Sequence, residues 1–361
     1  MIYQYIHTWN KGDAVGNEVW AIHAQMDKNN IENRIVKSYP EIPQADTVLF
    51  YDVEKNLLPE DLLIFHFAWI TPEPIWKKLR NLPCRKIMIY HNITPAEFFE
   101  PYDKAMAKSA LRARQQLKEG AEFFDAAWAD SEYNAEELKA AGYKDVSVLP
   151  LVIAFDDYAK TPSRHVMDEL SDGYTNILFV GRMVPNKCLE DVIAVFAEYK
   201  KQHNPKSRLI FVGNDSMTGY VNKLRHMCRE LKIKDVLFKS HCPFADILAY
   251  YRSADAFVCM SEHEGFCVPL LEAMYFRVPL IAYEAGAVPL TMGDAGVCVR
   301  SKEPSATSSI LHALLSDPDM ISDMKAKQEE RLKVFETPAI MKIFLELLSK
   351  QYPVKEGEAK A

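Results

Sequence analysis

Residues 261–274 read SEHEGFCVPLLEAM and directly follow a short apolar run, AFVCM, at 256–260. We expect the apolar run to form a buried parallel strand, because it is short and bounded by polar residues. Pro269 favours the first position of a helix, and the leucines, alanine and methionine after it are good helix formers. The stretch therefore predicts a strand, a tight turn through Glu264 and Gly265, and a helix.

Two carboxylates flank this junction, Glu264 in the loop and Glu272 in the first turn of the predicted helix. In an open α/β sheet, ligands bind beyond the carboxyl ends of the strands, where the following helix presents unpaired N–H groups to anions. Ionised carboxylates accept hydrogen bonds from the paired hydroxyls of a ribose or hexose. The junction predicts a ligand with both sugar and phosphate groups, although Glu272 alone would also fit a structural role at the positive end of the helix.

The whole string, with Glu264 and Glu272 separated by seven residues inside EGF and PLLEAM, resembles the signature of the family 4 glycosyltransferases. These enzymes have the GT-B fold, two doubly wound Rossmann-like α/β domains that face a central cleft. The family commonly reads E-G-F-G, with backbone amides bound to the sugar, whereas the fourth residue here is Cys267. The resemblance implies that Glu264 binds sugar hydroxyls, that Glu272 binds the ribose, and that the donor is also contacted by Gly265, Phe266, Cys267 and Val268.

Length and charge fit a two-domain enzyme of this kind. The chain has 361 residues, enough for two domains, and a formal net charge of −7 with interspersed signs, which argues against nucleic acid as a partner. Seven cysteines without a C-x-x-C pair favour reduced thiols over disulfides or a zinc site. Residues 1–13 lack a signal-peptide pattern, and no apolar stretch reaches the roughly 20 residues that span a bilayer. We expect a cytoplasmic protein, with peripheral contact to the inner face of the membrane as an open alternative.

The first half of the chain alternates predicted strands with helical segments, as βαβ units do. A glycine-bearing loop with G-x-x-x-G spacing follows the first strand, at 9–17, so the dinucleotide fingerprint G-x-G-x-x-G is absent. In the resembled family this loop approaches the donor phosphate and sugar, and Gly16 is the matching glycine. A turn-forming role would also explain Gly16.

His91 stands at the carboxyl end of the predicted strand 85–91, beside the loop Asn92–Pro95. A histidine on a buried strand is often a core residue, but one at the strand end can face a cleft. Family members have a matching histidine that faces the transferred sugar. The string HNITP is also similar to a bacterial subset that builds surface polysaccharides, with mannosyltransferase-like members.

The predicted helix 102–120 carries a run of cations, and two interpretations of it stay open. It is a solvated face, or it contacts anionic lipid or a lipid-linked acceptor. Its basic residues are Lys104, Lys108, Arg112, Arg114 and Lys118.

A new strand at 176–180 leads into Gly181-Arg182-Met183-Val184-Pro185-Asn186-Lys187. Arg182 can contact phosphate oxygens with its forked guanidinium, and Lys187 adds a mobile point charge, so the pair suits a diphosphate. A surface pair of cations is the alternative. The string resembles the G-R-x-x-x-x-K element of the family, in which a glycine usually follows; here Cys188 follows.

We expect four parts: an acceptor-side Rossmann-like domain at 1–153, a linker at 154–175, a nucleotide-sugar domain at 176–336, and at 337–361 a helix that crosses back to the first domain plus a frayed tail. Asp317-Pro318-Asp319 is formally an Asp-x-Asp metal motif, but capping explains it better. No metal site and no cofactor are expected.

The resemblance implies metal-independent transfer of a hexose from a GDP- or UDP-sugar to a hydroxyl of a glycan or lipid-linked saccharide, with retention of configuration. Arg182 and Lys187 would stabilise the leaving diphosphate, and His91 and Glu264 would contact the sugar. Two other classes stay open: a non-catalytic nucleotide-sugar-binding subunit, and a GT-B-like epimerase or phosphorylase.

Overall fold

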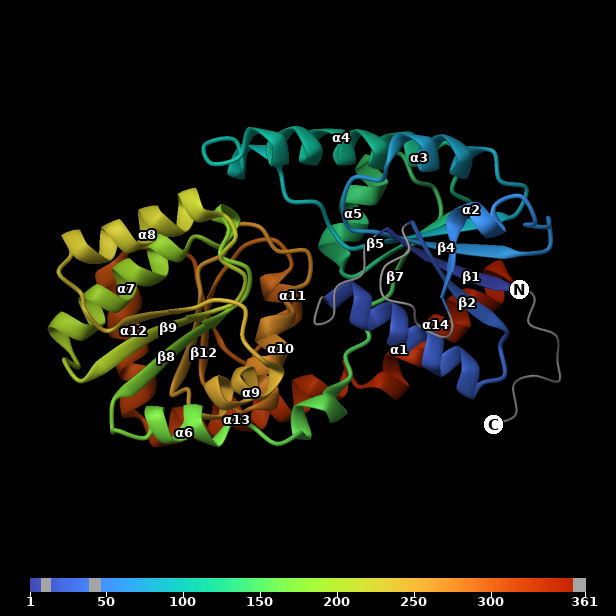
Figure 1. Ribbon diagram of the computed structural model, residues 1–361. Coiled ribbons are helices and arrows are strands. Elements are labelled where there is room, and N and C mark those ends of the chain that lie inside the picture. The colour runs from blue at the N-terminus through green and yellow to red at the C-terminus, as the bar shows by residue number, and fades with distance from the viewer. Residues whose placement is uncertain (8–13, 39–46, 353–361) are drawn as a thin grey trace. The chain divides into compact units, whose positions relative to one another are not determined.

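The computed structural model describes residues 1–7, 14–38 and 47–352. They form two compact units, each built around a parallel sheet (Figure 1). Unit 1 comprises 1–96, 108–154 and 335–361, and unit 2 comprises 97–107 and 155–334. Residues 8–13, which hold most of the glycine-bearing loop expected after the first strand, lie outside the described residues.

Unit 1 holds a seven-stranded sheet in the order β3-β2-β1-β4-β5-β6-β7. Its strands are β1 (Ile2–Ile6), β2 (Asn33–Lys37), β3 (Thr47–Leu49), β4 (Leu62–Phe67), β5 (Arg85–Tyr90), β6 (Ala126–Ala129) and β7 (Val146–Val148). Its helices are α1 (Ala14–Lys28), α2 (Phe50–Val53), α3 (Glu73–Arg80), α4 (Lys104–Gly120, in unit 1 from residue 108), α5 (Glu132–Ala140) and α14 (Thr337–Gln351).

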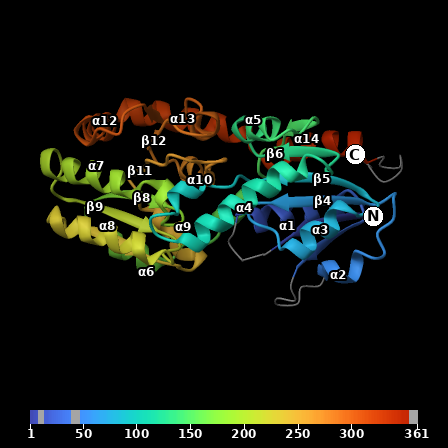
Figure 2. The same ribbon diagram turned by 90° about the horizontal axis from the view of Figure 1, so that it is seen from above.

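Side-chain alternation along the buried strands assigns these helices to the two faces of the sheet. On β4, Leu62 and Ile64 pack in one apolar cluster with α1 and α14, whereas Phe65 and Phe67 pack in another with α3, α4 and α5. Figure 2 shows α3 and α4 over one face of the sheet. His66 follows Leu62 and Ile64 in the period of two, so it belongs to the α1 face.

Unit 2 holds a six-stranded sheet in the order β10-β9-β8-β11-β12-β13. Its strands are β8 (Thr175–Val180), β9 (Ser207–Val212), β10 (Val236–Lys239), β11 (Ala256–Cys259), β12 (Leu280–Tyr283) and β13 (Val297–Val299). Its helices are α6 (Arg164–Leu170), α7 (Leu189–Gln202), α8 (Thr218–Glu230), α9 (Phe244–Arg252), α10 (Val268–Tyr275), α11 (Val288–Met292), α12 (Pro304–Ser316) and α13 (Pro318–Lys333). Helix α7 packs beside α12, and α10 beside α13 (Figure 1).

Both sheets have the strand order of a doubly wound fold, and each therefore has a point where the order reverses. This switch point lies between β1 and β4 in unit 1 and between β8 and β11 in unit 2. The α/β fold class expected from the sequence is confirmed. Ligands of such sheets bind at the carboxyl ends of the strands beside the switch point.

The unit boundaries differ from the expected ones in two places. Residues 154–175 were expected to be a linker, but they carry a short 3-10 helix, Phe155–Ala159, and α6, and all but Ala154 belong to unit 2. The segment belongs to unit 2 because it buries the apolar side chains of Tyr158, Val166 and Leu170. The polar residues between them conceal this packing at the level of the sequence. Residues 97–107 also belong to unit 2, which interrupts the expected first domain.

Two residues lie elsewhere within their helices than expected. Helix α10 begins at Val268 and has no acidic residue in its first turn, so Glu272 lies in the second turn. Gly16 is a buried residue of the first turn of α1, not part of the preceding loop. Helix α10 begins before Pro269 and α1 begins before Gly16, so both helices start earlier than the sequence suggests.

Candidate functional site

In unit 2, the loops after β8 and β11 meet at the switch point of the sheet. The Nζ of Lys187, at the end of the first loop, lies 2.7 Å from Oε1 of Glu264 in the second. Both side chains are largely buried, with 16% and 7% of their surface exposed. Burial disfavours the charge on Lys187, but attraction to Glu264 outweighs it and raises the pKa of the lysine above its ordinary value. The structure thus brings together two of the predicted site residues as a charged pair.

The loop that holds Glu264 is fixed from two sides by hydrogen bonds. The side-chain amide of Asn186 donates to the carbonyl of His263 at 3.0 Å, and its backbone carbonyl accepts from Glu262 N–H at 2.9 Å. The hydroxyl of Thr291 donates to the carbonyl of Phe266. A loop held this way can present its carboxylate and amides in one geometry, as a preorganised site requires.

Gly286 closes tightly against this loop. It has φ of +55°, and a Cβ at this position would lie 2.4 Å from the carbonyl oxygen of Glu264, which already accepts from Ala287 N–H at 2.9 Å. Real Cβ atoms do not approach a carbonyl oxygen so closely. The Glu264 oxygen belongs to the backbone, so it cannot move aside as the end of a flexible side chain could. The loop position of Glu264 therefore depends on glycine here.

Gly286→Ala is expected to lower the free energy of unfolding by about 1 to 3 kcal/mol, because it combines a strained φ with a backbone clash. It should also weaken ligand binding at the loop. Gly142→Ala is the matched control, since Gly142 also has positive φ, at +103°, but an added Cβ would meet only the Ala121 Cβ at 3.6 Å. Urea denaturation and ligand-induced thermal shift measure the two effects. Equal loss of ligand response in both variants would contradict this role for Gly286.

The two cysteines that replace expected glycines both take left-handed backbone conformations. Cys188 has φ of +48° and Cys267 has φ of +72°, and each stands immediately before a helix. This conformation explains why glycine suits both positions, because L-residues are strained there. Both thiols are buried, so neither points into solvent. All seven cysteines of the chain are free thiols.

Glu272 is held by two tyrosines of unit 2. The Tyr158 hydroxyl donates to its Oε1 at 2.9 Å, and the Tyr251 hydroxyl donates to its Oε2 at 2.6 Å. Burial raises the pKa of Glu272, against the opposing effect of these two hydroxyls. A carboxylate oxygen has more than one lone pair, so both oxygens can still accept a further hydrogen bond. The tyrosines could not be foreseen from the sequence, since they lie on distant segments.

Arg182, the other predicted phosphate contact, is exposed, and within the described residues its side chain makes no ion pair. Gly265 and Phe266 lie in the loop before α10, Cys267 caps the helix, and Val268 is its first residue. The structure therefore places the unit 2 candidates on two adjacent βα junctions.

His91 lies in unit 1, directly after β5. Its Nε2 lies 3.0 Å from Nδ1 of His66, and its Nδ1 lies 3.1 Å from Oδ1 of Asp130. The side chain is 1% exposed, and both ring nitrogens have partners within unit 1. A contact from His91 to a donor sugar stays a prediction. His66, Asp130 and Glu18 beside it were missed, although alternation along β4 could have placed His66 on the same face as His91.

The basic helix α4 is partly neutralised. Arg112 bonds Glu73 at 2.6 Å and Glu119 at 2.7 Å, and Arg114 pairs with Glu137. These pairs hold the helix to its own unit, which leaves Lys104, Lys108 and Lys118 as its exposed cations. The capping role expected for the Asp317-Pro318-Asp319 string is confirmed, because the Asp317 side chain accepts from Asp319 and Met320 N–H.

Three groups of side chains could hold a metal ion within the described residues. Two lie in unit 2 and already have a lysine counterion: Lys187 pairs with Glu264, and Lys302 pairs with Asp191 and Glu262. The third group, in unit 1, consists of Glu18, His66 and His91. No lysine or arginine of the described chain pairs with Glu18.

Cavities in unit 2 lie at both ends of its sheet. One of about 540 Å³ is lined by Thr175, Asp255 and Pro279, which precede or begin strands, so it lies at the amino ends, away from the switch-point loops. Another, of about 330 Å³, is lined by Pro185, Cys188 and Glu262 together with Phe98 and Tyr102. The smaller cavity thus borders the candidate site.

The part of the chain that matches a known protein family lies within unit 2. Residues 167–331 match the profile of the family described as Glycosyl transferases group 1. The D-inositol 3-phosphate glycosyltransferase of Corynebacterium glutamicum is 30% identical over 164 residues, 44% of this chain and 39% of that protein. The trehalose synthase of Pyrococcus horikoshii is 28% identical over 179 residues, 47% of this chain and 42% of that protein. The matches thus span less than half the length of these curated relatives.

Solved structures resemble the whole chain. The Anabaena protein HepE, in complex with UDP and glucose, has a TM-score of 0.74 at 16% identity, over 97% of this chain and 99% of that one. The sucrose-phosphate synthase of Thermosynechococcus elongatus has a TM-score of 0.73 at 16% identity, over 97% and 98%. The fold is that of the GT-B glycosyltransferases. Among the described helices, none is both long and apolar enough to span a bilayer.

Proposed function

We propose that the chain is a glycosyltransferase that moves a hexose from a GDP- or UDP-sugar to a hydroxyl of a glycan or lipid-linked saccharide, with retention of configuration. One observation carries the proposal: the Lys187–Glu264 pair, at 2.7 Å, lies where the loops after β8 and β11 meet. A cation for phosphate and a carboxylate for hydroxyls are thereby fixed side by side at the switch point. The family match over 167–331 supports the same reaction class.

The roles of the residues follow from charge and position. Lys187, exposed Arg182 and the amides at the start of α10 stabilise the leaving diphosphate. Glu264 accepts hydrogen bonds from the sugar, and Glu272 from the ribose. His91 is assigned to the sugar and Gly16 to the donor, each from its match to the family pattern. No side chain is assigned as a covalent nucleophile, and a leaving phosphate oxygen takes the acceptor proton.

Cations of the chain replace a metal ion at the diphosphate in this proposal. The transfer rate is therefore expected to change less than twofold when Mg²⁺ or Mn²⁺ is added to or omitted from the assay. The physical reason is that Arg182 and Lys187 supply the positive charge that a bound ion would supply. Release of nucleoside diphosphate measures the rate. A more than tenfold dependence on added Mg²⁺ would contradict metal-independent stabilisation of the leaving group.

A panel of nucleotide sugars with free and lipid-linked saccharide acceptors tests the activity. Consumption of one donor only with an acceptor supports transfer, and the anomeric proton coupling of the product reports retention. Donor binding without consumption would favour a non-catalytic binding subunit. Conversion of the donor into an isomer without acceptor would favour an epimerase.

The acceptor side of the proposal includes a polysaccharide or lipid-linked chain at an anionic membrane surface. Exposed Lys104, Lys108 and Lys118 of α4 are the cations available for such a contact. Flotation with liposomes that contain or lack anionic lipid tests it, and equal flotation would remove the membrane from the account.

A further inference from the structure

Polar side chains line the carboxyl ends of the central strands of unit 1, on the face that α1 covers. Gln4 lies on β1 and His66 on β4, while His91 follows β5 and Asp130 follows β6. All four share the strand face of the apolar residues that pack with α1 and α14. Glu18 reaches them from α1. The group lies at the switch point between β1 and β4, where such sheets bind ligands.

One ring nitrogen of His66 lies close to one ring nitrogen of His91. Their rings are parallel, with an interplanar angle of 3°, and His66 Nδ1 lies 3.0 Å from His91 Nε2. The outer nitrogens are held by acceptors. His66 Nε2 lies 3.3 Å from Oε1 of Gln4, and His91 Nδ1 lies 3.1 and 3.2 Å from the two oxygens of Asp130.

These outer contacts decide where the protons are. The amide nitrogen of Gln4 donates to the Val19 carbonyl at 3.4 Å, so Oε1 of Gln4 is the acceptor and His66 Nε2 carries a hydrogen. With its hydrogen on Nε2, a neutral His66 has a lone pair on Nδ1. His91 Nδ1 donates to Asp130, which leaves Nε2 of a neutral His91 with a lone pair as well. Two lone pairs 3.0 Å apart require a proton or a metal ion between them.

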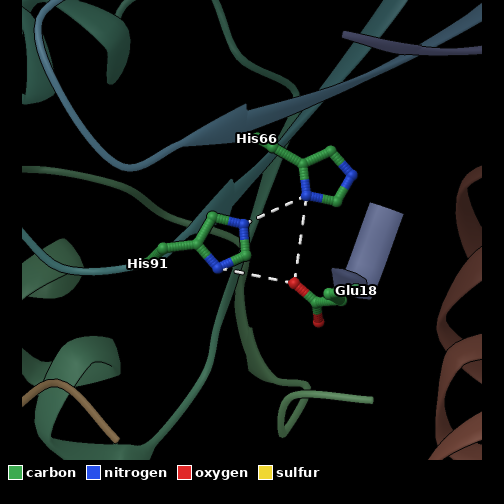
Figure 3. Close-up of side chains that lie close together, drawn as sticks. All are labelled: Glu18, His66 and His91. Carbon is green, nitrogen blue, oxygen red and sulfur yellow. Dashed lines mark hydrogen bonds and ion pairs between the residues drawn. The ribbon is translucent and has the colours of Figure 1, made fainter. Parts of the chain in front are cut away.

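Glu18 distinguishes the two cases. Its side chain is fully buried, and neither carboxylate oxygen makes a hydrogen bond of good geometry with the described residues, although the backbone amide of Val152 lies nearby. Oε2 lies 3.5 Å from His91 Nδ1 and 4.0 Å from His66 Nδ1 (Figure 3). A proton shared by the histidines gives Glu18 an ion-pair partner at 3.5 to 4.0 Å but no hydrogen bond of good geometry. A metal ion takes Glu18 as its third ligand.

The charges of the group fit a divalent ion. Glu18 and Asp130 are both buried carboxyl groups, and no lysine or arginine of the described residues pairs with either. One divalent cation would neutralise both carboxylates. It would also complete two arrangements in which a ligating histidine donates its other N–H to an acceptor, the pattern that fixes metal-bound imidazoles.

We propose that unit 1 binds one Zn²⁺ ion through Glu18, His66 and His91, with Asp130 and Gln4 as the groups that orient the two imidazoles. One donor atom from each of the three ligands lies within 4.8 Å of the others. Ligand atoms about 2.0 to 2.2 Å from a tetrahedral Zn²⁺ lie about 3.3 to 3.5 Å apart. His66 Nδ1 lies 3.0 Å from His91 Nε2 and 4.0 Å from Glu18 Oε2, so the three side chains are near this spacing before any ion binds. Two imidazoles and a carboxylate suit Zn²⁺ better than Mg²⁺ or Ca²⁺, which prefer oxygen ligands.

The proposal is independent of the glycosyltransferase proposal, because it concerns an ion buried in unit 1 and not an ion on the diphosphate. It does bear on His91. With one nitrogen on the ion and the other on Asp130, the ring would influence a donor sugar through its position and charge, not by donating an N–H.

Zinc analysis of the purified full chain tests the site directly. We expect about one Zn²⁺ per chain after expression with zinc, visible d–d absorption when Co²⁺ replaces it, and a higher melting temperature of the zinc form than of chelator-treated protein. Glu18→Gln keeps the shape of the side chain and should weaken Zn²⁺ binding more than 100-fold, while Asp130→Asn should weaken it about 10- to 100-fold.

His312→Gln is the matched control. His312 stacks on His203 in unit 2 with ring centroids 4.4 Å apart, but this pair is not among the potential metal groups of the described chain. The control should retain full zinc binding. Folded wild-type protein that takes up neither Zn²⁺ nor Co²⁺ would overturn the proposal in favour of a shared proton, which ¹⁵N spectra of the two histidines would reveal. The proposal would also be overturned if both Glu18→Gln and Asp130→Asn bound Zn²⁺ as tightly as wild type does. If a variant does not fold, the Co²⁺ spectrum of the wild-type protein decides whether the histidines and Glu18 bind a metal ion.

Discussion

Lys187→Ala is expected to slow sugar transfer about 100- to 1,000-fold, the usual cost of removing one preorganised group that stabilises charge in the transition state. The ammonium group lies 2.7 Å from Glu264, and both side chains are largely buried. Low local dielectric strengthens such a charge, and the carboxylate beside it keeps the lysine protonated. The loss should appear in kcat as well as in kcat/KM, because the diphosphate gains charge as it leaves.

Lys200→Ala is the matched control for this variant. Lys200 also pairs with a carboxylate, Asp235, at 2.8 Å, but it lies in the last turn of α7, far along the helix from the loop. Its replacement should change transfer less than threefold. If Lys187→Ala also changes transfer less than threefold, or if both variants lose activity equally, Lys187 does not stabilise the leaving group.

Glu272→Gln is expected to weaken nucleoside diphosphate binding about 10- to 100-fold, because a hydrogen bond to a charged group contributes about 1.5 to 3 kcal/mol. The same change also disturbs the acceptors of Tyr158 and Tyr251, so some loss of thermal stability is expected. Isothermal titration with UDP and GDP measures the affinity. Unfolding by urea measures the structural part separately.

Ligands without ribose hydroxyls separate ribose binding from a purely structural role of Glu272. Wild type should bind 2′,3′-dideoxynucleoside diphosphate about as weakly as Glu272→Gln binds the natural ligand. The variant should not distinguish the two ligands, since the interaction is then already lost. Full discrimination by the variant would show that Glu272 serves the tyrosines alone. Tyr251→Phe removes a tyrosine hydroxyl without removing the carboxylate, and it should keep the discrimination.

The sequence predicts the sheets well, because parallel strands buried on both faces read as short apolar runs. The strands expected at 85–91, 176–180 and 256–260 form β5, β8 and β11, with each end within one residue of its expected place. The charged pair of unit 2 was also foreseeable, since Lys187 and Glu264 both stand at βα junctions and the carboxyl ends of neighbouring strands share one edge.

Tertiary partners were not foreseeable in the same way. Glu18 and His66 are separated by two intervening strands along the chain, and nothing in their spacing predicts that they approach one another. The tyrosines on Glu272 come from 158 and 251, one of them in the stretch expected to be a linker. The inclusion of 97–107 in unit 2 depends on contacts such as Tyr102 with Tyr220, whose ring centroids lie 5.3 Å apart. Such packing depends on the fold, not on local pattern.

The central claim is that the β8–β11 edge of unit 2 binds a nucleoside diphosphate sugar. Thermal unfolding with a panel of UDP- and GDP-sugars tests it most directly, because a ligand present at 100 times its Kd stabilises the folded state by about 2.7 kcal/mol. At least one donor should raise the Tm of wild type by several degrees, and the shift should be much smaller in Lys187→Ala. No shift with any donor, or an equal shift in the variant, would contradict the claim.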